Sequence, residues 1–213
     1  MDNIIENYKV VFNKCFTIKT NTNLIVVSKS RTIEDITKLI DINHFHFGEN
    51  KVQEALNKWQ NIKTVNKNIK LHLIGKLQSN KADKALLLFD YIHSLDSRAL
   101  ATRLSNEEKK INKKIKYFIQ VNTGKETQKS GIFEEELLSF YKFCTEVVQL
   151  NILGLMCIPP IYESPRKHFQ KLKELSKTIG NLELSMGMSN DYEIALEEGA
   201  SYVRIGSAIF GPR

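Results

Sequence analysis

Several features are absent or scarce in this 213-residue sequence, and each absence excludes a class of protein. No apolar run approaches the roughly 20 residues of a membrane-spanning helix. The first 14 residues lack the apolar stretch and small-residue cleavage site of a secretory signal. The three cysteines, Cys15, Cys144 and Cys157, are far apart and form no Cys-x-x-Cys pair that would indicate zinc or a redox couple. We therefore expect a cytoplasmic protein with reduced thiols and no membrane association.

The length and the proportion of hydrophobic residues predict one globular domain, residues 1–213, with room for a single buried core. A net charge of +7 would suit a nucleic acid partner if the basic residues were clustered. Lysines are instead scattered, and the densest stretch, residues 109–116, alternates with Asn and Ile as a solvated helix end does. We therefore expect no nucleic acid binding. A basic nucleic-acid-binding protein remains an alternative hypothesis, and it would require an affinity for nucleic acid that falls as the salt concentration rises.

Short β-branched or aromatic runs alternate with helical periodicity along the whole chain. The runs are nearly continuous in apolar residues, as is typical of parallel strands buried on both faces. Eight such strands separated by helices favour an α/β fold, a closed (β/α)₈ barrel of the TIM type. The predicted strands are residues 24–29, 44–49, 71–77, 91–96, 116–122, 152–158, 182–188 and 202–207.

An open doubly wound sheet is the alternative fold. It is disfavoured because the first strand-to-helix turn, residues 28–32, carries no glycine-rich phosphate fingerprint. Residues 1–20 are amphipathic and precede the first strand, so they predict an extra helix packed on the barrel. Several later helices open with a suitable capping residue such as Thr32, Ser97 or Asn190. The predicted helices are residues 32–40, 51–60, 79–88, 97–111, 133–150, 165–179 and 190–198.

In such barrels the chemistry lies at the carboxyl ends of the strands, where this chain places many polar residues. Lys29 is the most informative, because a lysine that ends a buried apolar strand is paired, lowered in pKa or covalently modified. A neutral lysine is a nucleophile that condenses with an aldehyde to a Schiff base. The residues alone fit equally well a Lys29 that reaches solvent at the barrel mouth.

The last two strands add a second indication of a ligand. The segments LSMGMSND at residues 184–191 and VRIGSAIFG at residues 203–211 place Ser189, Gly206 and Ser207 where these barrels often hold phosphate. Tight turns are the ordinary reason for such glycines. Two of these turns after the last two of eight strands favour a phosphate site.

Seven ordered segments, which span nearly the whole chain, resemble the pyridoxal phosphate homeostasis protein family. These are single-domain barrels that bind pyridoxal 5′-phosphate (PLP) and are related to the N-terminal domain of alanine racemases. The segments are VVSKS at 26–30, FGENKVQEAL at 47–56, LHLIGKLQSNKADKAL at 71–86, IHSLDS at 92–97, QVNTGKETQKSGI at 120–132, LGLMCIPP at 153–160 and LSMGMSNDYEIALEEGASYVRIGSAIFG at 184–211.

The resemblance implies roles for the residues at the predicted barrel mouth. It implies that Lys29 holds PLP as a Schiff base and that Ser189, Gly206 and Ser207 gather its phosphate. Arg204 matches the arginine that faces the pyridine nitrogen in alanine racemases, and a guanidinium there keeps that nitrogen unprotonated. Two further residues, Asn50 and Met186, match family positions near the cofactor.

The function implied by the resemblance is intracellular PLP homeostasis and supply, without robust catalytic turnover. PLP-dependent apoenzymes are the implied partners, and we expect a monomer. The alternative is a PLP-dependent amino-acid racemase or decarboxylase of the same barrel type. We disfavour it because alanine racemases take a second base, a tyrosine, from a further domain that this sequence does not contain.

The chain departs from the family pattern in three places. Lys76 stands where the family usually has histidine, Cys157 stands where it has threonine, and the sequence stops soon after the eighth strand. We expect the first two to lie beside the pocket and the third to loosen the last helix. A further lysine, Lys129, matches a family lysine near the barrel mouth, although a solvated loop lysine is the more ordinary role.

Five histidines complete the list of reactive side chains. His44 and His46 alternate along the second predicted strand and so share one face, as a pair of metal ligands would. No third ligand is evident, so we assign no metal and expect packing roles. His72, His93 and His168 are isolated in the sequence, and we expect the same of them.

Overall fold

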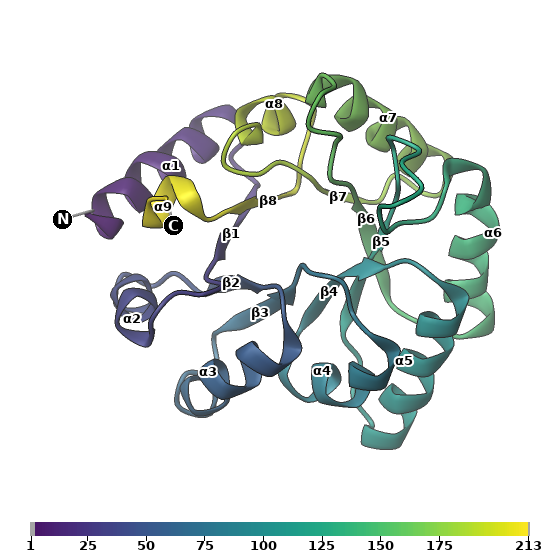
Figure 1. Cartoon of the computed structure of the whole chain (residues 1–213), viewed down its shortest axis with the longest axis horizontal. Coiled ribbons are helices and arrows are strands. Elements are labelled where there is room, and N and C mark those ends of the chain that lie inside the picture. Colours follow the sequence, from purple (N-terminus) through teal and green to yellow (C-terminus); the bar gives the residue numbers. More distant parts are fainter. Residues whose placement is uncertain (1–2, 213) are drawn as a thin grey trace.

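Eight parallel strands close into a barrel in the order in which they follow one another along the chain (Figure 1). The computed structural model describes residues 3–212. β1 pairs with both β2 and β8, which confirms the (β/α)₈ barrel and excludes the open doubly wound sheet. The strands are β1 Asn23–Val27, β2 His46–Glu49, β3 Lys70–Leu73, β4 Tyr91–Leu95, β5 Lys116–Gln120, β6 Ile152–Met156, β7 Glu183–Ser185 and β8 Tyr202–Ile205.

Helices surround the barrel and cover the outer face of every strand (Figure 1). Thr32 and Ser97 cap their helices as predicted, because each side-chain oxygen accepts a backbone N–H three residues further on. Within residues 3–212, no helix has the length and apolar character needed to cross a membrane. The helices are α1 Ile4–Ile18, α2 Ile33–Asp41, α3 Val52–Val65, α4 Ala82–Leu88, α5 Arg98–Ile111, α6 Leu137–Lys142, α7 Pro165–Thr178, α8 Tyr192–Glu197 and α9 Ser207–Phe210.

Three predicted helices differ from the structure. The one expected over residues 79–88 begins as a 3₁₀ turn, Ser79–Lys81, before α4. The single helix expected over residues 133–150 is a 3₁₀ turn, Glu134–Glu136, followed by α6 and then by a π-helical segment, Phe143–Val147. Asn190 is not a helix cap, because α8 begins at Tyr192 and Asp191 occupies the capping position. The Asp191 carboxylate accepts the backbone N–H of Met188 at 2.6 Å, which tightens the loop before the helix.

The expected N-terminal helix, α1, packs on the barrel beside the last helix, α9 (Figure 1). Ile4, Tyr8, Val11 and Cys15 are buried at helical spacing, so one face of α1 covers α9, α8 and α2. Asn7 donates a hydrogen bond from its amide to the Ile209 carbonyl at 3.1 Å. The four-residue α9 is therefore held by α1 and does not form a loose end.

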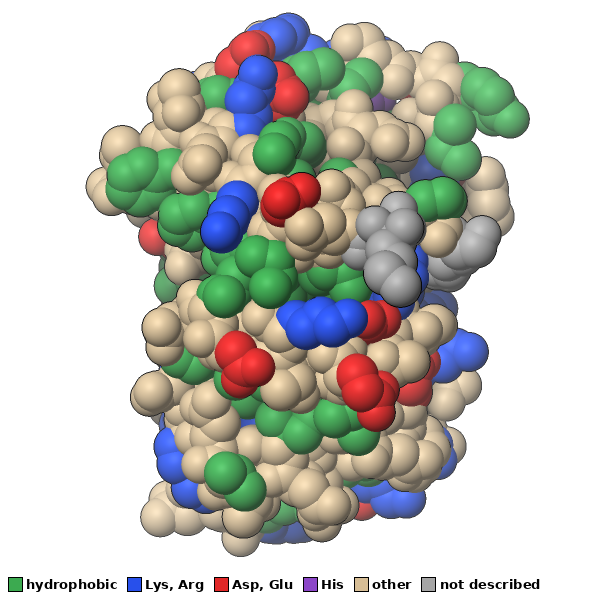
Figure 2. Space-filling model, turned by 90° about the vertical axis from the view of Figure 1, so that its left-hand side faces the viewer, with side chains coloured by type: hydrophobic (Ala, Val, Ile, Leu, Met, Phe, Trp, Pro, Cys, Tyr) green, Lys and Arg blue, Asp and Glu red, His purple; other side chains and the backbone are tan. Residues whose placement is uncertain are grey.

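Figure 2 shows the face of the molecule that includes α1 and α2, turned toward the viewer. Among the described residues of this face, lysine and arginine side chains lie between acidic and hydrophobic ones. They form no continuous basic surface here. This face therefore lacks the electrostatic footprint that a nucleic acid would require.

The barrel interior holds its own small cluster of buried side chains, separate from the layer between strands and helices. Aromatic rings dominate it, with Tyr91, Phe118 and Tyr202 close together. A side chain at Gly154 would collide with the Phe118 ring, so glycine leaves the space that the ring fills. This part of the barrel interior is thereby filled by side chains.

Candidate functional site

A cavity of about 560 Å³ opens at the carboxyl ends of the strands, within the range of roughly 300–1,000 Å³ usual for small-molecule sites. Its walls come from the loops that follow β1, β2, β3, β6, β7 and β8. Six of the seven residues predicted for the site line it: Lys29, Asn50, Ser189, Arg204, Gly206 and Ser207. Met186 does not line it, since its side chain is fully buried in the barrel layer; the neighbouring Met188 lines the cavity instead.

Lys29 lies in the turn after β1, half-buried, between two serines that are fastened to the rest of the barrel. Ser28 donates its backbone N–H to the Gly48 carbonyl at 3.0 Å and its hydroxyl to Glu49 Oε1 at 2.8 Å. Ser30, whose φ of 59° is in the left-handed region, donates its N–H to Glu54 Oε1 at 2.6 Å. Both neighbours of Lys29 are therefore fixed, and the turn presents its side chain from a rigid base.

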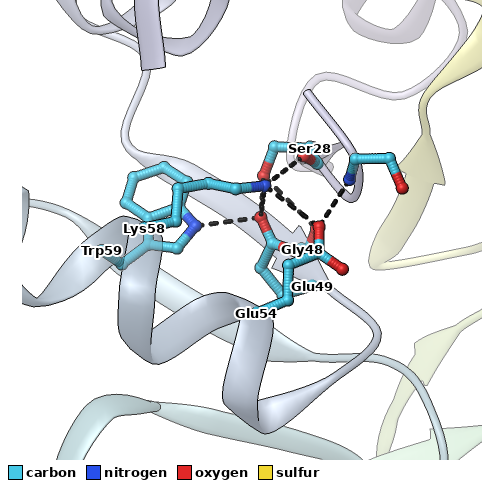
Figure 3. A network of polar contacts seen from close by, with 7 residues as sticks. Ser28, Gly48, Glu49, Glu54, Lys58 and Trp59 are labelled. Atoms are coloured by element: carbon cyan, nitrogen blue, oxygen red, sulfur yellow. Dashed lines mark hydrogen bonds and ion pairs between the residues drawn. The ribbon is translucent and has the colours of Figure 1, made fainter. Parts of the chain in front are cut away.

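A buried ion pair supports this turn (Figure 3). The Lys58 ammonium, on α3, donates to Glu49 Oε1 at 3.0 Å, to the Ser28 carbonyl at 2.8 Å and to Glu54 at 3.3 Å. Trp59 donates its indole N–H to the same Glu49 oxygen at 2.9 Å. Glu49 was recognisable in the sequence as a strand-end residue, whereas Lys58 and Trp59 gave no signal because they lie in the middle of a helix.

Ser189 joins the loops that follow β7 and β8. Its hydroxyl oxygen accepts the backbone N–H groups of Gly206 and Ala208, each at 3.3 Å. Ser207 lies between those two residues and is exposed at the cavity. Ser189 and Ser207 thus present two hydroxyls beside small-residue backbone, the type of surface that receives the oxygens of a phosphate.

Arg204 forms the floor of the cavity and is 4% exposed. Its guanidinium donates to Ser185 Oγ at 2.7 Å and to the Cys157 carbonyl at 2.9 Å. Burial lowers the pKa of Arg204 from its ordinary value, and the neighbouring Cys157 and Asp191 act against that shift. These contacts use part of its five N–H donors and leave the others for a ligand.

Asn50 and Asp191 are the remaining polar residues of note in the wall. The loop after β3 passes so close to the Asn50 backbone that any side chain at Gly75 would collide with it. Burial raises the pKa of Asp191, and Arg204 and the Met188 N–H oppose this. Asp191 was missed as a site residue, although it ends the segment 184–191 that indicated the phosphate site.

The residues at which the chain departs from the family pattern lie at different distances from the cavity. Lys76 is exposed and does not line it, contrary to the expectation that it lies beside the pocket. Cys157 is fully buried and adjacent, because its carbonyl holds Arg204; burial raises the pKa of its thiol to about 12. Lys129 forms an ion pair with Glu126 at 2.6 Å and does not line the cavity.

The histidines do not gather around a metal. Within residues 3–212, no group of three His, Cys, Asp or Glu side chains is placed to hold one. His44 donates from Nε2 to the His46 carbonyl and accepts the Tyr8 hydroxyl at Nδ1, so it fastens α1 to the barrel. His72 and His93, which were expected only to pack, also lie in one series of hydrogen bonds with His46.

Comparison with known proteins places this barrel in a defined class. The family model described as "Alanine racemase, N-terminal domain" matches residues 1–213. An alanine racemase of Bartonella henselae, solved with covalently bound pyridoxal phosphate, shares the fold with a TM-score of 0.77. Its sequence identity is 18%, and the match covers 98% of this chain and 58% of that one. The barrel and its cavity thus define a domain of the alanine racemase N-terminal class.

Two further relatives narrow the class to one family. The pyridoxal phosphate homeostasis protein of Vibrio alginolyticus is 37% identical over 210 residues, which are 94% of this chain and 90% of that protein. PipY of Synechococcus elongatus, solved with PLP bound, is 35% identical, with a TM-score of 0.87 and coverage of 98% and 100%. The chain belongs to the pyridoxal phosphate homeostasis protein family.

Proposed function

We propose that this protein binds PLP in the cavity through a Schiff base on Lys29 and contributes to intracellular PLP homeostasis without robust catalytic turnover. The observation that carries the proposal is the convergence of Lys29, Ser189, Ser207 and Arg204 on one cavity of suitable volume. The family membership and the PLP-bound structure of PipY support it. PLP-dependent apoenzymes are the proposed recipients, and the protein acts as a monomer.

The residues present fit the chemical groups of PLP. Lys29 supplies an amine for the aldehyde, and the two cavity serines supply hydroxyls for the phosphate, with the Gly206 loop beside them. Arg204 supplies N–H donors for the ring nitrogen. An arginine side chain has no acceptor, so the ring nitrogen accepts in this contact. Asn50 lies in the wall between these ends, and Met186 supports the β7 loop from within the barrel layer. PLP, when bound, supplies a reactive aldehyde conjugated with a pyridine ring.

The phosphate site is tested by comparing PLP with pyridoxal, which lacks the phosphate. Ser207→Asp is expected to weaken PLP binding by at least about 100-fold, because it adds a like charge beside the phosphate. Ser207→Asn is the matched control, since asparagine has nearly the same size as aspartate and carries no charge. Visible absorbance during titration measures the affinities. Equal affinities of the wild-type protein for pyridoxal and PLP would place the phosphate elsewhere.

The alternative of a racemase makes a different prediction. An arginine that faces the ring nitrogen leaves it unprotonated and makes the ring a weak electron sink. Racemisation also needs an acid or base on each face of the substrate. Among the described residues that line the cavity, none is a tyrosine, histidine or cysteine to oppose Lys29. Its two carboxylates are engaged elsewhere, since Glu163 pairs with Lys167 and Asp191 accepts the Met188 N–H.

We therefore expect the PLP-loaded protein to racemise alanine, serine and lysine no faster than free PLP does. Chiral chromatography after incubation measures the conversion. A rate of several turnovers per second that disappears in Lys29→Ala would establish the racemase and refute the binding protein. The same assay on the Ser207→Asp variant separates activity in this cavity from a contaminating enzyme.

A further inference from the structure

Three histidines, a serine and Arg204 form one continuous chain of hydrogen bonds through the barrel. His46 Nδ1 lies 3.0 Å from His72 Nε2, and His72 Nδ1 lies 3.0 Å from His93 Nε2. His93 Nδ1 lies 2.8 Å from Ser185 Oγ, to which Arg204 donates at 2.7 Å. The chain therefore begins at the first residue of β2 and ends at the floor of the cavity.

The chain crosses the barrel interior. His93 lies on β4 and Ser185 on β7, and these strands are separated in the sheet by β5 and β6. His72, His93 and Ser185 are fully buried, and His46 is half-buried. Tyr91 stacks on His72, and Phe118 stacks on His93, each with ring centroids 4.2 Å apart. The aromatic rings of the interior thus shield the chain from water and fix the imidazole planes.

Arg204 determines the direction in which every proton of the chain points. An arginine only donates, so Ser185 accepts from Arg204 and has one proton of its own to donate. If that proton goes to His93 Nδ1, then neutral His93 and His72 each carry their proton on Nε2 and donate to the next imidazole. In the reverse order Ser185 would accept twice, and its own proton would lack an acceptor in a buried site.

The imidazoles are held in the neutral form that this order requires. Burial lowers the pKa of His72 and His93 well below the ordinary value, and His93 and Arg204, respectively, add to the effect. His46 and His44 also face His72, as does Lys63. Burial lowers the pKa of His46 too; of the charged groups that face it, Lys70 and Lys116 add to this and Asp90 opposes it.

We propose that His46, His72, His93 and Ser185 are positioning residues that hold the Arg204 guanidinium against the ring nitrogen of PLP through a chain with a single proton order. This inference rests on the proposed function for the identity of the ligand. The proton order itself is a property of the protein without ligand. Two experiments therefore test the two parts separately.

The first experiment measures the histidine tautomers of the ligand-free protein by ¹⁵N NMR, with signals assigned by histidine-to-glutamine substitutions. His72 and His93 are expected to carry their proton on Nε2 and to stay neutral from about pH 5 to 8, where an unperturbed histidine titrates. A proton on Nδ1 of His93, or protonation of His72 or His93 in this pH interval, would refute the proposed proton order. This result does not depend on whether PLP binds.

The second experiment compares PLP with its analogue in which CH replaces the ring nitrogen. We expect the wild-type protein to bind PLP about tenfold more tightly, as for one buried hydrogen bond. In Ser185→Ala the two affinities should become nearly equal, whereas a general loss of structure would weaken both ligands alike. Ser185→Thr keeps the hydroxyl and is expected to restore the preference.

His168→Gln is a control, because it removes a buried histidine that does not belong to this series of hydrogen bonds. The His168 side chain contacts Thr123 and Glu163 instead. This variant should keep the preference for PLP. An unchanged preference in Ser185→Ala, or no preference in the wild-type protein, refutes the positioning of Arg204. If the wild-type protein binds neither ligand, the proposed function fails, and the NMR result decides the proton order alone.

Discussion

Lys29→Ala is expected to abolish the visible absorbance of the PLP-loaded protein completely, because the substitution removes the amine that attaches the aldehyde. The fold should remain, since Lys29 is a half-buried turn residue that lines a cavity and is absent from the hydrophobic core. We expect its free energy of unfolding to change by about 1 kcal/mol or less. Absorbance spectra and urea denaturation measure the two effects on the same samples.

Lysines outside the cavity provide the controls for this variant. Lys76→Ala and Lys129→Ala remove an exposed lysine and an ion-paired loop lysine, neither of which lines the cavity. Both should keep the absorbance. Borohydride reduction of the loaded wild-type protein, followed by peptide mass analysis, should place the pyridoxyl group on Lys29. Labelling of a different lysine would refute the assignment.

Lys58→Met should be among the most destabilising single substitutions in the chain. Glu49 is fully buried and Lys58 is 9% exposed, so the substitution leaves a buried carboxylate without its cation. Glu49 Oε2 lacks a hydrogen-bond partner among the described residues, so the carboxylate would keep only the neutral donors Ser28 and Trp59 on its other oxygen. We expect a loss of about 3–5 kcal/mol in the free energy of unfolding, measured by urea denaturation.

A second substitution and a surface pair show whether charge burial is the cause. Lys58→Met combined with Glu49→Gln should regain much of the stability, because the unpaired charge is then absent. Lys14 pairs with Glu193 at 3.1 Å, with about half of each side chain exposed, so Lys14→Met should cost less than about 1 kcal/mol. Equal losses in Lys14→Met and Lys58→Met would contradict the explanation.

The fold could be predicted from the sequence because all eight strands are apolar runs between helical segments. The carboxyl ends of the strands were less predictable. The sixth and seventh strands were expected to reach residues 158 and 188, whereas β6 ends at Met156 and β7 at Ser185. Cys157 and Met186 remain fully buried beyond those ends. Both residues still donate a backbone N–H to the neighbouring strand, Cys157 to Ser185 and Met186 to Tyr202. Burial therefore continues past the ends of the strands, and an apolar pattern reports burial and not where a strand ends.

The candidate site, too, could be predicted from the sequence only in part. Lys29, Ser189 and Arg204 were recognisable because they end strands and match family segments. The chain of His46, His72 and His93 was not, because its members come from three strands and contact one another only through the register of β2, β3 and β4. One signal was present in the sequence, namely a histidine near the start of each of three consecutive strands.

The packing of α1 on α9 and the pairing of β1 with β8 have a consequence for synthesis on the ribosome. Both contacts join segments that lie far apart in the sequence. Until residues 202–210 emerge, the nascent chain has an unpaired β1 edge and an uncovered apolar face of α1. Such surfaces promote aggregation and slow folding through contacts of long sequence separation. We therefore expect barrel closure to be a late step of folding, which makes the open barrel the stage at which chaperones engage it.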